Sequence, residues 1–294
     1  MGVSNATDLA SGKGHKDENF PVASVLIAKA HRPVILAFYR FARAADDVAD
    51  HATAAPAQKL ALLEKMRAGL TGESDASPEG ADLRRALAER GLTNQHGLDL
   101  LEAFRRDVSK TRYASWDELM DYCRYSAMPV GRFVLDVHGE SRDTWPANDA
   151  LCAALQVVNH LQDCAKDYAE IDRVYIPLDL LEQQSLSVEI LKQPAAPPQL
   201  RLVLSELARR TQRLLETARP FAAQIRDRRL SLEVSVIQTL AEDLTARLLV
   251  RDPLSQRVHH RRGEMPGLLL RAVGRFASAR LRPKRGGVIS KTAP

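Results

Sequence analysis

Residues 38–50 decide the fold and read Phe38-Tyr39-Arg40-Phe41-Ala42-Arg43-Ala44-Ala45-Asp46-Asp47-Val48-Ala49-Asp50. Asp46 and Asp50 are four residues apart, so on a helix they share one face, separated by about 6 Å along the axis. Tyr39 and Arg43 continue the same stripe at the helical repeat. Two like charges at this spacing destabilise a helix slightly unless a cation bridges them. Between apolar residues, such a stripe is unusual for a surface and indicates an interior site.

A second stretch repeats the spacing and reads Gln156-Val157-Val158-Asn159-His160-Leu161-Gln162-Asp163-Cys164-Ala165-Lys166-Asp167. Gln156 and Asn159 share the face of Asp163 and Asp167 in an otherwise apolar helix, and buried polar groups need partners. Two facing carboxylate pairs supply the hard oxygen ligands that suit Mg²⁺, which polarises a diphosphate leaving group. A single pair is far more typical of a solvated helix face than of a metal site; the repetition is what favours a metal site.

The rest of the chain is also helical in pattern. Leu, Ala, Arg and Glu dominate, alternating β-branched runs are nearly absent, and Pro and Gly separate the segments. The 294 residues are 45% hydrophobic and 27% charged, which is typical of a globular protein. We therefore expect one all-α domain. The expected helices span residues 33–52, 56–70, 79–90, 96–110, 115–127, 129–138, 147–170, 198–226, 230–251 and 265–282.

Several function classes are excluded by composition. No run reaches the ~18 apolar residues of a membrane-spanning helix, and residues 1–19 do not read as an export signal. Cys123, Cys152 and Cys164 lack metal-ligand spacing and are odd in number, which fits a reducing compartment. We expect a cytoplasmic protein.

Basic charge is concentrated near the C-terminus. Residues 251–294 carry nine Arg and two Lys against Asp252 and Glu264, a net charge of +9 that leaves −4 for the other 250 residues. Phe276 is the one aromatic residue in this segment, which disfavours nucleic-acid binding. The helix expected over residues 265–282 has an apolar side and a basic side. It is interpreted either as a peripheral contact with the inner face of the membrane or as a final bundle helix.

Aromatic residues are concentrated in the earlier part of the chain. Of the 15, 13 lie at or before Tyr175. This distribution has two interpretations: the later helices pack mainly through Leu, or the earlier helices line an aromatic pocket.

Four motifs together resemble the squalene/phytoene synthase family. They are the two aspartate stretches above, Tyr122-Cys123-Arg124-Tyr125-Ser126-Ala127 with Val130 and Gly131 following, and Asp172-Arg173-Val174-Tyr175-Ile176-Pro177. The similarity spans roughly residues 18–255. It implies an isoprenoid-synthase-type helical bundle with a central cavity over residues 18–282, between a flexible N-terminus (1–17) and a basic tail (283–294).

The resemblance also implies roles for individual residues. Metal ligands are Asp46, Asp50, Asn159, Asp163 and Asp167. Catalytic groups are Tyr39, Arg43, Tyr122 and Tyr175. Substrate contacts are Phe20, Ser24, Phe38, Phe41, Arg43, Gln156, Asn159 and Arg173. Each residue type also has a structural explanation: Arg43 as an intrahelical partner of Asp46 or Asp47, Ser24 as a helix cap, and the aromatic residues as core.

Within the family, the opening Glu18-Asn19-Phe20-Pro21-Val22-Ala23-Ser24 and the run from Gln162 to Tyr168 resemble a bacterial hopanoid-pathway branch. Its members are Mg²⁺-assisted carbon–oxygen lyases that ionise presqualene diphosphate and capture the carbocation with water, giving hydroxysqualene and diphosphate without NADPH. Two departures from the family pattern are Ser126-Ala127-Met128 in place of Val-Ala-Gly, and Gln162 in place of an arginine.

Three points stay open at this stage. Alternative functions are presqualene diphosphate or phytoene synthesis from two prenyl diphosphates, and a non-catalytic assembly or binding role on the same fold. His160 is interpreted as a structural or surface histidine, so no residue is assigned to the water. The sequence leaves the oligomeric state undetermined.

Overall fold

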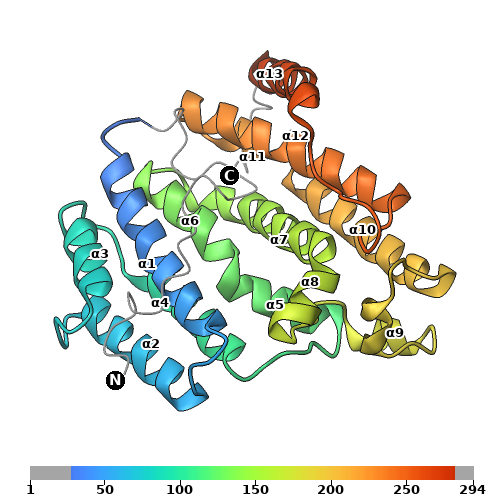
Figure 1. Ribbon diagram of the computed structural model, residues 1–294. Coiled ribbons are helices and arrows are strands. Elements are labelled where there is room, and N and C mark those ends of the chain that lie inside the picture. The colour runs from blue at the N-terminus through green and yellow to red at the C-terminus, as the bar shows by residue number, and fades with distance from the viewer. Residues whose placement is uncertain (1–27, 282–294) are drawn as a thin grey trace, which may run out of the picture.

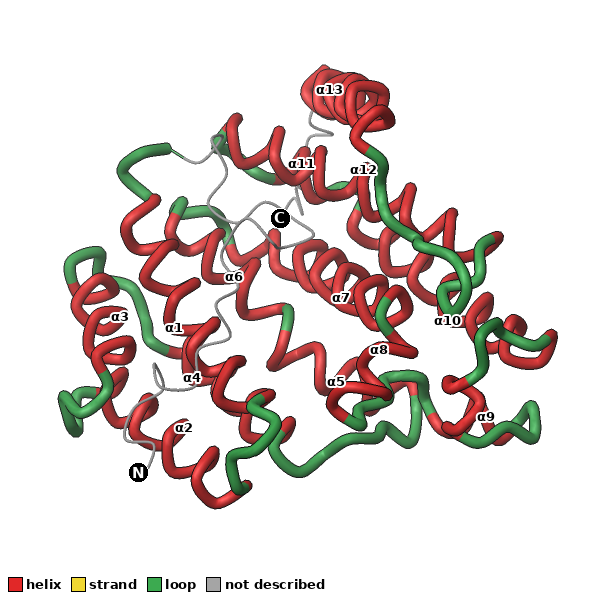
Figure 2. Tube along the Cα trace, in the orientation of Figure 1, coloured by secondary structure: helices red, strands yellow, loops and turns green. Residues whose placement is uncertain are grey.

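Residues 28–281 are described by a computed structural model of the chain, and their ordered elements are helices (Figure 1). In chain order, with the short 3₁₀ turns marked η, they are α1 Arg32–Asp50, α2 Pro56–Thr71, α3 Pro78–Ala88, α4 Gln95–Asp107, α5 Trp116–Ser126, α6 Met128–Val137, η2 Arg142–Thr144, α7 Trp145–Gln162, α8 Cys164–Ile171, α9 Leu178–Glu182, η3 Val188–Lys192, α10 Pro198–Ala218, α11 Phe221–Gln224, α12 Arg228–Val250, η4 Arg262–Glu264 and α13 Met265–Leu281. Figure 2 shows helices joined by loops, with no strand in this part of the chain. The all-α prediction is confirmed.

Local sequence signals account for where many helices begin. Proline, which fits the first turn because its missing N–H has no partner there, occupies that turn in α1, α2, α3, α6, α7 and α10. The Ser115 hydroxyl accepts a hydrogen bond from the Glu118 N–H and caps α5. The Asp227 carboxylate accepts from the N–H groups of Arg229 and Leu230 and caps α12.

Two helices expected to be continuous are broken, and these predictions were wrong. The segment expected over 147–170 divides at Asp163, whose φ of −105° and ψ of 9° lie outside the helical region. The segment expected over 198–226 divides after α10, because Pro220 cannot donate the backbone hydrogen bond that would continue the helix. The short helix α9 was not expected. The domain boundaries expected at residues 17/18 and 282/283 lie outside the described residues.

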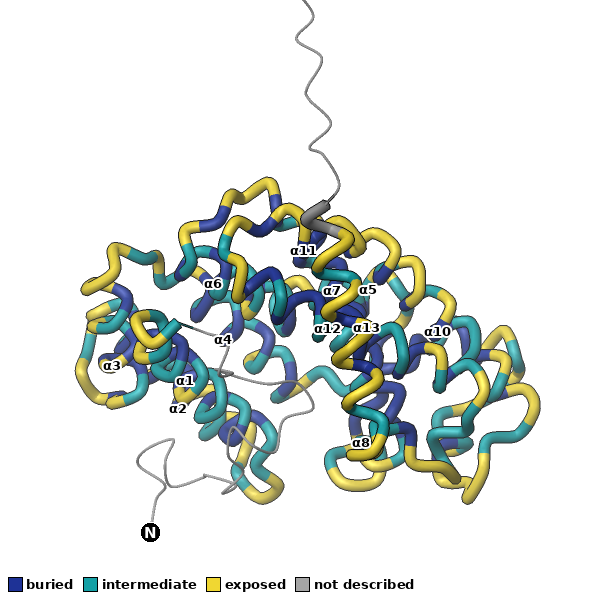
Figure 3. Tube along the Cα trace, turned by 90° about the horizontal axis from the view of Figure 1, so that it is seen from above, coloured by how far each residue is buried: buried dark blue, intermediate teal, exposed yellow. Residues whose placement is uncertain are grey.

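Helices α6 and α7 lie at the centre of the bundle. Figure 1 shows α1 to α4 on one side of them and α10 and α12 on the other. Of the apolar clusters in the described chain, one joins α6 to α1–α4, and two contain residues of α7 together with α10 or α12. Figure 3 shows buried residues along α7 and exposed residues on the outer helices and loops. No helix in the described range is long and apolar enough to span a membrane.

The close approach of α6 to α7 depends on Gly131. A Cβ atom added there would lie 2.0 Å from Asn148 Oδ1 and 2.7 Å from Cys152 Sγ. A side chain at position 131 would therefore have to displace the Asn148 amide or the Cys152 thiol on α7.

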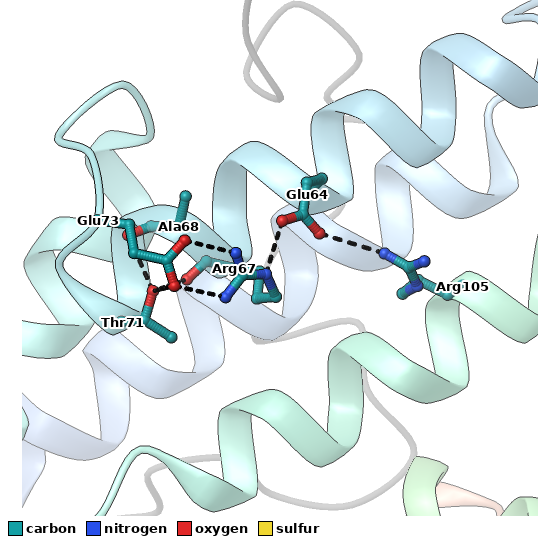
Figure 4. Close-up of polar contacts among 6 residues, drawn as sticks. All are labelled: Glu64, Arg67, Ala68, Thr71, Glu73 and Arg105. Carbon is teal, nitrogen blue, oxygen red and sulfur yellow. Dashed lines mark hydrogen bonds and ion pairs between the residues drawn. The ribbon is translucent and has the colours of Figure 1, made fainter.

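Surface ion pairs connect α2 with α4 (Figure 4). The Arg67 guanidinium donates to both carboxylate oxygens of Glu73, at 2.8 and 2.6 Å, and to Glu64 Oε1 at 2.7 Å. Arg105 of α4 donates to the other oxygen of Glu64 at 3.3 Å. Hydrogen bonds from Arg67, and then from Thr71, lower the pKa of Glu73 to about 2. These groups are exposed, so they orient the two helices more than they stabilise the fold.

Candidate active site

The charged stripe of α1 borders a cavity. Tyr39, Arg43 and Asp46 are among its lining residues. Arg43 Nη1 donates to Asp46 Oδ2 at 2.9 Å, and its Nη2 donates to Asp47 Oδ1 at 2.6 Å. Without a ligand, Arg43 therefore serves as an intrahelical partner. Because its side chain also borders the cavity, it is placed to exchange that contact for an anionic ligand.

The cavity itself is large and mainly apolar, with a volume of about 390 Å³. Its walls come from α1, α4, α6, α7, α11 and α12. The lining residues are Ile35, Phe38, Tyr39, Ala42, Arg43, Asp46, Phe104, Val130, Gly131, Phe133, Val134, Leu135, Asn148, Leu151, Cys152, Leu155, Phe221, Leu230, Glu233, Val234 and Ile237. A hydrocarbon chain fits such a wall, because burying apolar surface is favourable and the polar groups are few. The expected central cavity is therefore present.

The aromatic residues chosen from the sequence fall in two environments. Phe38 lines the cavity and stacks on Phe133, with ring centroids 3.9 Å apart. Phe41 is fully buried in the α1–α4 core and is not among the residues that line this cavity, and its expected contact with substrate stays a prediction. Position 41 is one turn from position 38 but faces the neighbouring helices. Phe20 and Ser24 lie outside the described residues.

The second aspartate pair lies at the junction between α7 and α8. Asp163 ends α7, and Asp167 lies in the first turn of α8, where its N–H donates to the Asp163 carbonyl at 2.8 Å. One helical hydrogen bond thus survives across the break and keeps the two residues adjacent. Gln156 and Asn159 are half-buried on α7. Gln162, which stands where the family has arginine, donates to the Val258 carbonyl and ties this end of α7 to the loop before α13.

Arg173 connects the first aspartate pair to a buried tyrosine cluster. Its Nη1 lies 3.0 Å from Asp50 Oδ1 and donates to the Tyr175 hydroxyl at 3.2 Å. Its Nη2 donates to the Asp107 backbone carbonyl at 3.2 Å, and Tyr122 donates to the Asp107 carboxylate at 2.9 Å. The Val174 N–H bonds to the Thr111 carbonyl and holds this stretch in place. Arg173 is therefore a buried junction between α1, α4 and the segment after α8.

The three tyrosines chosen as catalytic groups are not equivalent. Tyr39 is half-buried at the cavity wall, whereas Tyr122 and Tyr175 are buried in the core beside Tyr113 and His160. The rings of His160 and Tyr175 stack with centroids 3.4 Å apart. Burial, and then Arg173, lower the pKa of His160 to about 3, so it is neutral at pH 7. This agrees with its interpretation as a structural histidine.

Sequence reasoning missed two members of this cluster, Tyr113 and Asp107. Tyr113 is 1% exposed, and its ring stacks on Tyr175 with centroids 5.6 Å apart. Asp107 is buried at the last position of α4. Neither belongs to a motif or to a charged stripe, so the sequence contains no local signal for them.

Both aspartate pairs carry more negative charge than nearby cations offset. Burial, and then Asp50, raise the pKa of Asp46 to about 7, against the opposing effect of Arg43. Burial, and then Asp163, raise the pKa of Asp167 to about 7, and Asp50 adds to this increase. The two pairs are thus within electrostatic range of one another. Such carboxylates fit a hard divalent cation, which favours their ionised form.

The metal assignment remains a prediction. Within residues 28–281, no three His, Cys, Asp or Glu side chains form a group that could hold an ion. Asp50 instead contacts Arg173, and Asp46 contacts Arg43. Binding a metal ion through these carboxylates would therefore compete with both arginines.

Comparison with known proteins agrees with this geometry. The squalene/phytoene synthase family model matches residues 13–264. The hydroxysqualene synthase of Zymomonas mobilis is 57% identical over 93% of both chains, and that of Rhodopseudomonas palustris is 52% identical over 99% of both. Among solved structures, the squalene synthase HpnC from Alicyclobacillus acidocaldarius superposes with a TM-score of 0.69 and 32% identity, covering 82% of this chain and 90% of its own. The chain belongs to the squalene/phytoene synthase family.

Proposed function

We propose that this chain converts presqualene diphosphate and water into hydroxysqualene and diphosphate, in squalene and hopanoid biosynthesis. The observation that carries this proposal is the identity of 57% and 52%, over 93% and 99% of the chain, to relatives named hydroxysqualene synthase. The site supports it, because the charged end of α1 borders an apolar cavity of about 390 Å³. That arrangement suits a substrate with one anionic group and long hydrocarbon chains.

The diphosphate is bound at the charged end. Arg43 offers a planar fork of donors that matches phosphate oxygens. Asp46, Asp50, Asp163 and Asp167, with Asn159 as a neutral ligand, would hold Mg²⁺. When bound, Mg²⁺ neutralises the charge that develops on the leaving diphosphate. Gln156 and Arg173 are the further polar groups we assign to this end.

The cavity and the tyrosine cluster perform different tasks. Phe38, Phe133 and the aliphatic wall bind the hydrocarbon and exclude bulk water from the carbocation. Tyr39 is the phenol that borders the cavity in the described chain, and its π-electrons favour a nearby cation. Tyr175 acts indirectly, by accepting a hydrogen bond from Arg173, which in turn contacts Asp50. Tyr122 donates to the carboxylate of Asp107, whose backbone carbonyl accepts from Arg173.

Product analysis tests the proposed function. The full chain is incubated with presqualene diphosphate and Mg²⁺ in ¹⁸O-labelled water, with and without NADPH. We expect labelled hydroxysqualene in equal yield under both conditions. Squalene formed only with NADPH would instead indicate a reducing squalene synthase. Condensation of farnesyl or geranylgeranyl diphosphate as the sole activity would indicate a prenyltransferase, and no turnover of any of these substrates would indicate a non-catalytic protein.

We also propose that α13 rests on an anionic membrane. It packs on α12 (Figure 1) and exposes Leu270 at 74%, Val273 at 49% and Leu269 at 43%, beside the exposed Arg271. Exposed apolar side chains flanked by cations suit an anionic lipid surface, from which the enzyme would take a hydrocarbon substrate. The basic residues after 281 lie outside the described residues.

Vesicle co-sedimentation tests the membrane contact. We expect Leu270→Asp with Arg271→Glu to lower binding to anionic vesicles about 10-fold or more, because each basic group near such a surface contributes about 1 kcal/mol. Leu202→Asp is the matched control, since Leu202 is 58% exposed on α10, away from α13. Equal binding of both variants would assign α13 to the bundle alone.

A further inference from the structure

Asp172 ends α8 in a backbone conformation that few residues with a side chain adopt. Its φ of 48° and ψ of 40° lie in the left-handed region, which Asp and Asn tolerate better than other residues that carry a Cβ atom. The chain reverses at this residue, and the next N–H, that of Arg173, donates to the Asp167 carbonyl at 3.1 Å. Asp172 is exposed and Arg173 is buried, so the reversal turns the chain from the surface into the bundle.

Arg112, in the segment between α4 and α5, holds this reversal in place. Its guanidinium donates to the Asp172 backbone carbonyl and, from Nη2 at 2.6 Å, to Asp172 Oδ1. We call this pairing the Arg112–Asp172 clamp. The neighbouring Thr111 carbonyl accepts a hydrogen bond from the Val174 N–H at 2.9 Å. Contacts from residues 111 and 112 therefore fix the chain immediately before and after Arg173.

Arg173, which lies between these two contacts, reaches both aspartate pairs. Its N–H donates to the Asp167 carbonyl, and its Nη1 lies 3.0 Å from Asp50 Oδ1. The Asp107 carbonyl and the Tyr175 hydroxyl accept from the same guanidinium, each at 3.2 Å. The Arg173 side chain is 7% exposed and has little freedom to move. Its position therefore determines how the first pair lies relative to the second.

The Arg112–Asp172 clamp differs from an ordinary surface ion pair in what it connects. Arg84 and Asp75 form a pair with the same N···O distance of 2.6 Å and similar side-chain exposure, 31% and 77% against 25% and 71%. That pair joins α3 to the loop before it, and neither part contains a predicted site residue. Exposed pairs contribute little to stability by themselves. The effect of Arg112 is therefore expected at the aspartate pairs, and Arg84 provides a matched control.

We propose that Arg112 and Asp172 are positioning residues for the diphosphate end of the site. The clamp fixes the reversal after α8, and the reversal places Arg173. Arg173 in turn keeps the two aspartate pairs in fixed relative positions, so that both act on one diphosphate group and its cation. The part of this inference that concerns the substrate rests on the proposed function. Neither Arg112 nor Asp172 is among the residues that line the cavity, so they act through Arg173.

Binding of inorganic diphosphate in the presence of MgCl₂ tests the clamp, and calorimetry of the full chain measures the dissociation constant. We expect Arg112→Met and Asp172→Ala to weaken binding about 10-fold, which is typical of coupling between linked residues. Asp172→Asn should stay within about 3-fold of wild type, since asparagine adopts the left-handed conformation and its amide oxygen accepts from Arg112. Arg84→Met should bind like wild type. The kcat/KM for presqualene diphosphate should fall in the same order.

A second comparison separates positioning from a general effect on the fold. In an Arg173→Gln background, Arg112→Met should weaken diphosphate binding by less than about 2-fold further, because the residue through which it acts is already changed. Circular dichroism and thermal melting establish that each variant is folded. Arg112→Met, which leaves the backbone of residue 172 unchanged, decides the matter if Asp172→Ala does not fold.

Three results would each overturn the inference. They are an equal loss of binding on Arg112→Met in both backgrounds, wild-type binding by Arg112→Met, and equal losses in the Asp172→Ala and Asp172→Asn variants. Failure of the proposed function is distinguishable, because the binding measurements use no presqualene diphosphate. It would appear separately, as a wild-type protein that makes no alcohol.

Discussion

At the scale of single residues, two arginines offset part of the negative charge of the first aspartate pair. Arg43 contacts Asp46 and Asp47 within α1, whereas Arg173 reaches Asp50 from the segment after α8. Each arginine keeps a like-charged pair compatible with the fold while the site is empty of diphosphate. A cation that binds these carboxylates would have to displace the two arginines.

Replacing the first aspartate of either pair, Asp46 or Asp163, should stop catalysis without unfolding the protein. We expect Asp46→Asn or Asp163→Asn to lower turnover ~100-fold or more, because the diphosphate charge is no longer neutralised. The free energy of unfolding should not fall, since removing one of two neighbouring like charges relieves repulsion. Steady-state kinetics and urea unfolding measure both quantities. Asp82→Asn, on exposed α3, is the control. Turnover near the wild-type rate in either aspartate variant would contradict the prediction that these aspartates bind Mg²⁺.

Asp107 should make the protein less stable as the pH rises from 3.8 to about 7. Burial raises its pKa from 3.8 to about 7, although Arg173 and the Tyr122 hydrogen bond oppose this increase. Because the folded-state pKa exceeds the unfolded one, the stability that Asp107 contributes is complete below 3.8 and is lost as the pH rises through about 7. The free energy of unfolding should fall by up to ~1.4 kcal/mol per pH unit in this range because of Asp107, and we expect Asp107→Asn to abolish that contribution. Urea unfolding between these pH values measures it, and parallel profiles for the two proteins would contradict it.

At the scale of elements, the α6–α7 pair determines the shape of the cavity. Both helices contribute to its wall, and Gly131 allows them to approach. The break between α7 and α8 at Asp163 places the second aspartate pair at the end of α7 rather than along its side.

Adding one methyl group between these helices should therefore be harmful. We expect Gly131→Ala to destabilise the protein by about 1–3 kcal/mol, because its Cβ would overlap Asn148. Activity should fall as the cavity wall is displaced. Thermal melting and kinetics check both effects. Gly267→Ala in α13 is the control: nothing lies within 4 Å of a Cβ there, and alanine should stabilise the helix by up to about 1 kcal/mol. Equal stability of the two variants would contradict this account of the packing.

At the scale of the whole molecule, the chain combines a charged end and an apolar interior in one bundle. The aspartate pairs come from helices far apart in sequence, and bundle packing brings them within electrostatic range. Repulsion between these carboxylates lowers the stability of the folded state until a cation is bound.

Mg²⁺ should consequently stabilise the metal-free protein. At 100 times the dissociation constant we expect about 2.7 kcal/mol of added stability, because only the folded state holds the carboxylates together. Thermal melting with MgCl₂, against NaCl of equal ionic strength, measures the shift, and Asp167→Asn should reduce it. EDTA should abolish turnover while far-ultraviolet circular dichroism is unchanged. A melting temperature indifferent to Mg²⁺ would argue against metal binding by these residues.

The sequence by itself determined the helical class, the two Asp-x-x-x-Asp pairs and the family, because these depend on spacing within a single helix or motif. Only the tertiary structure separated Phe38 from Phe41, and Tyr39 from Tyr122 and Tyr175. It alone brought Arg173 to Asp50 and placed Glu233 in the cavity wall. Helical periodicity states which residues share a face, but not which neighbour that face meets. That second choice is made by packing between segments distant in sequence, and here it decides which residues border the cavity.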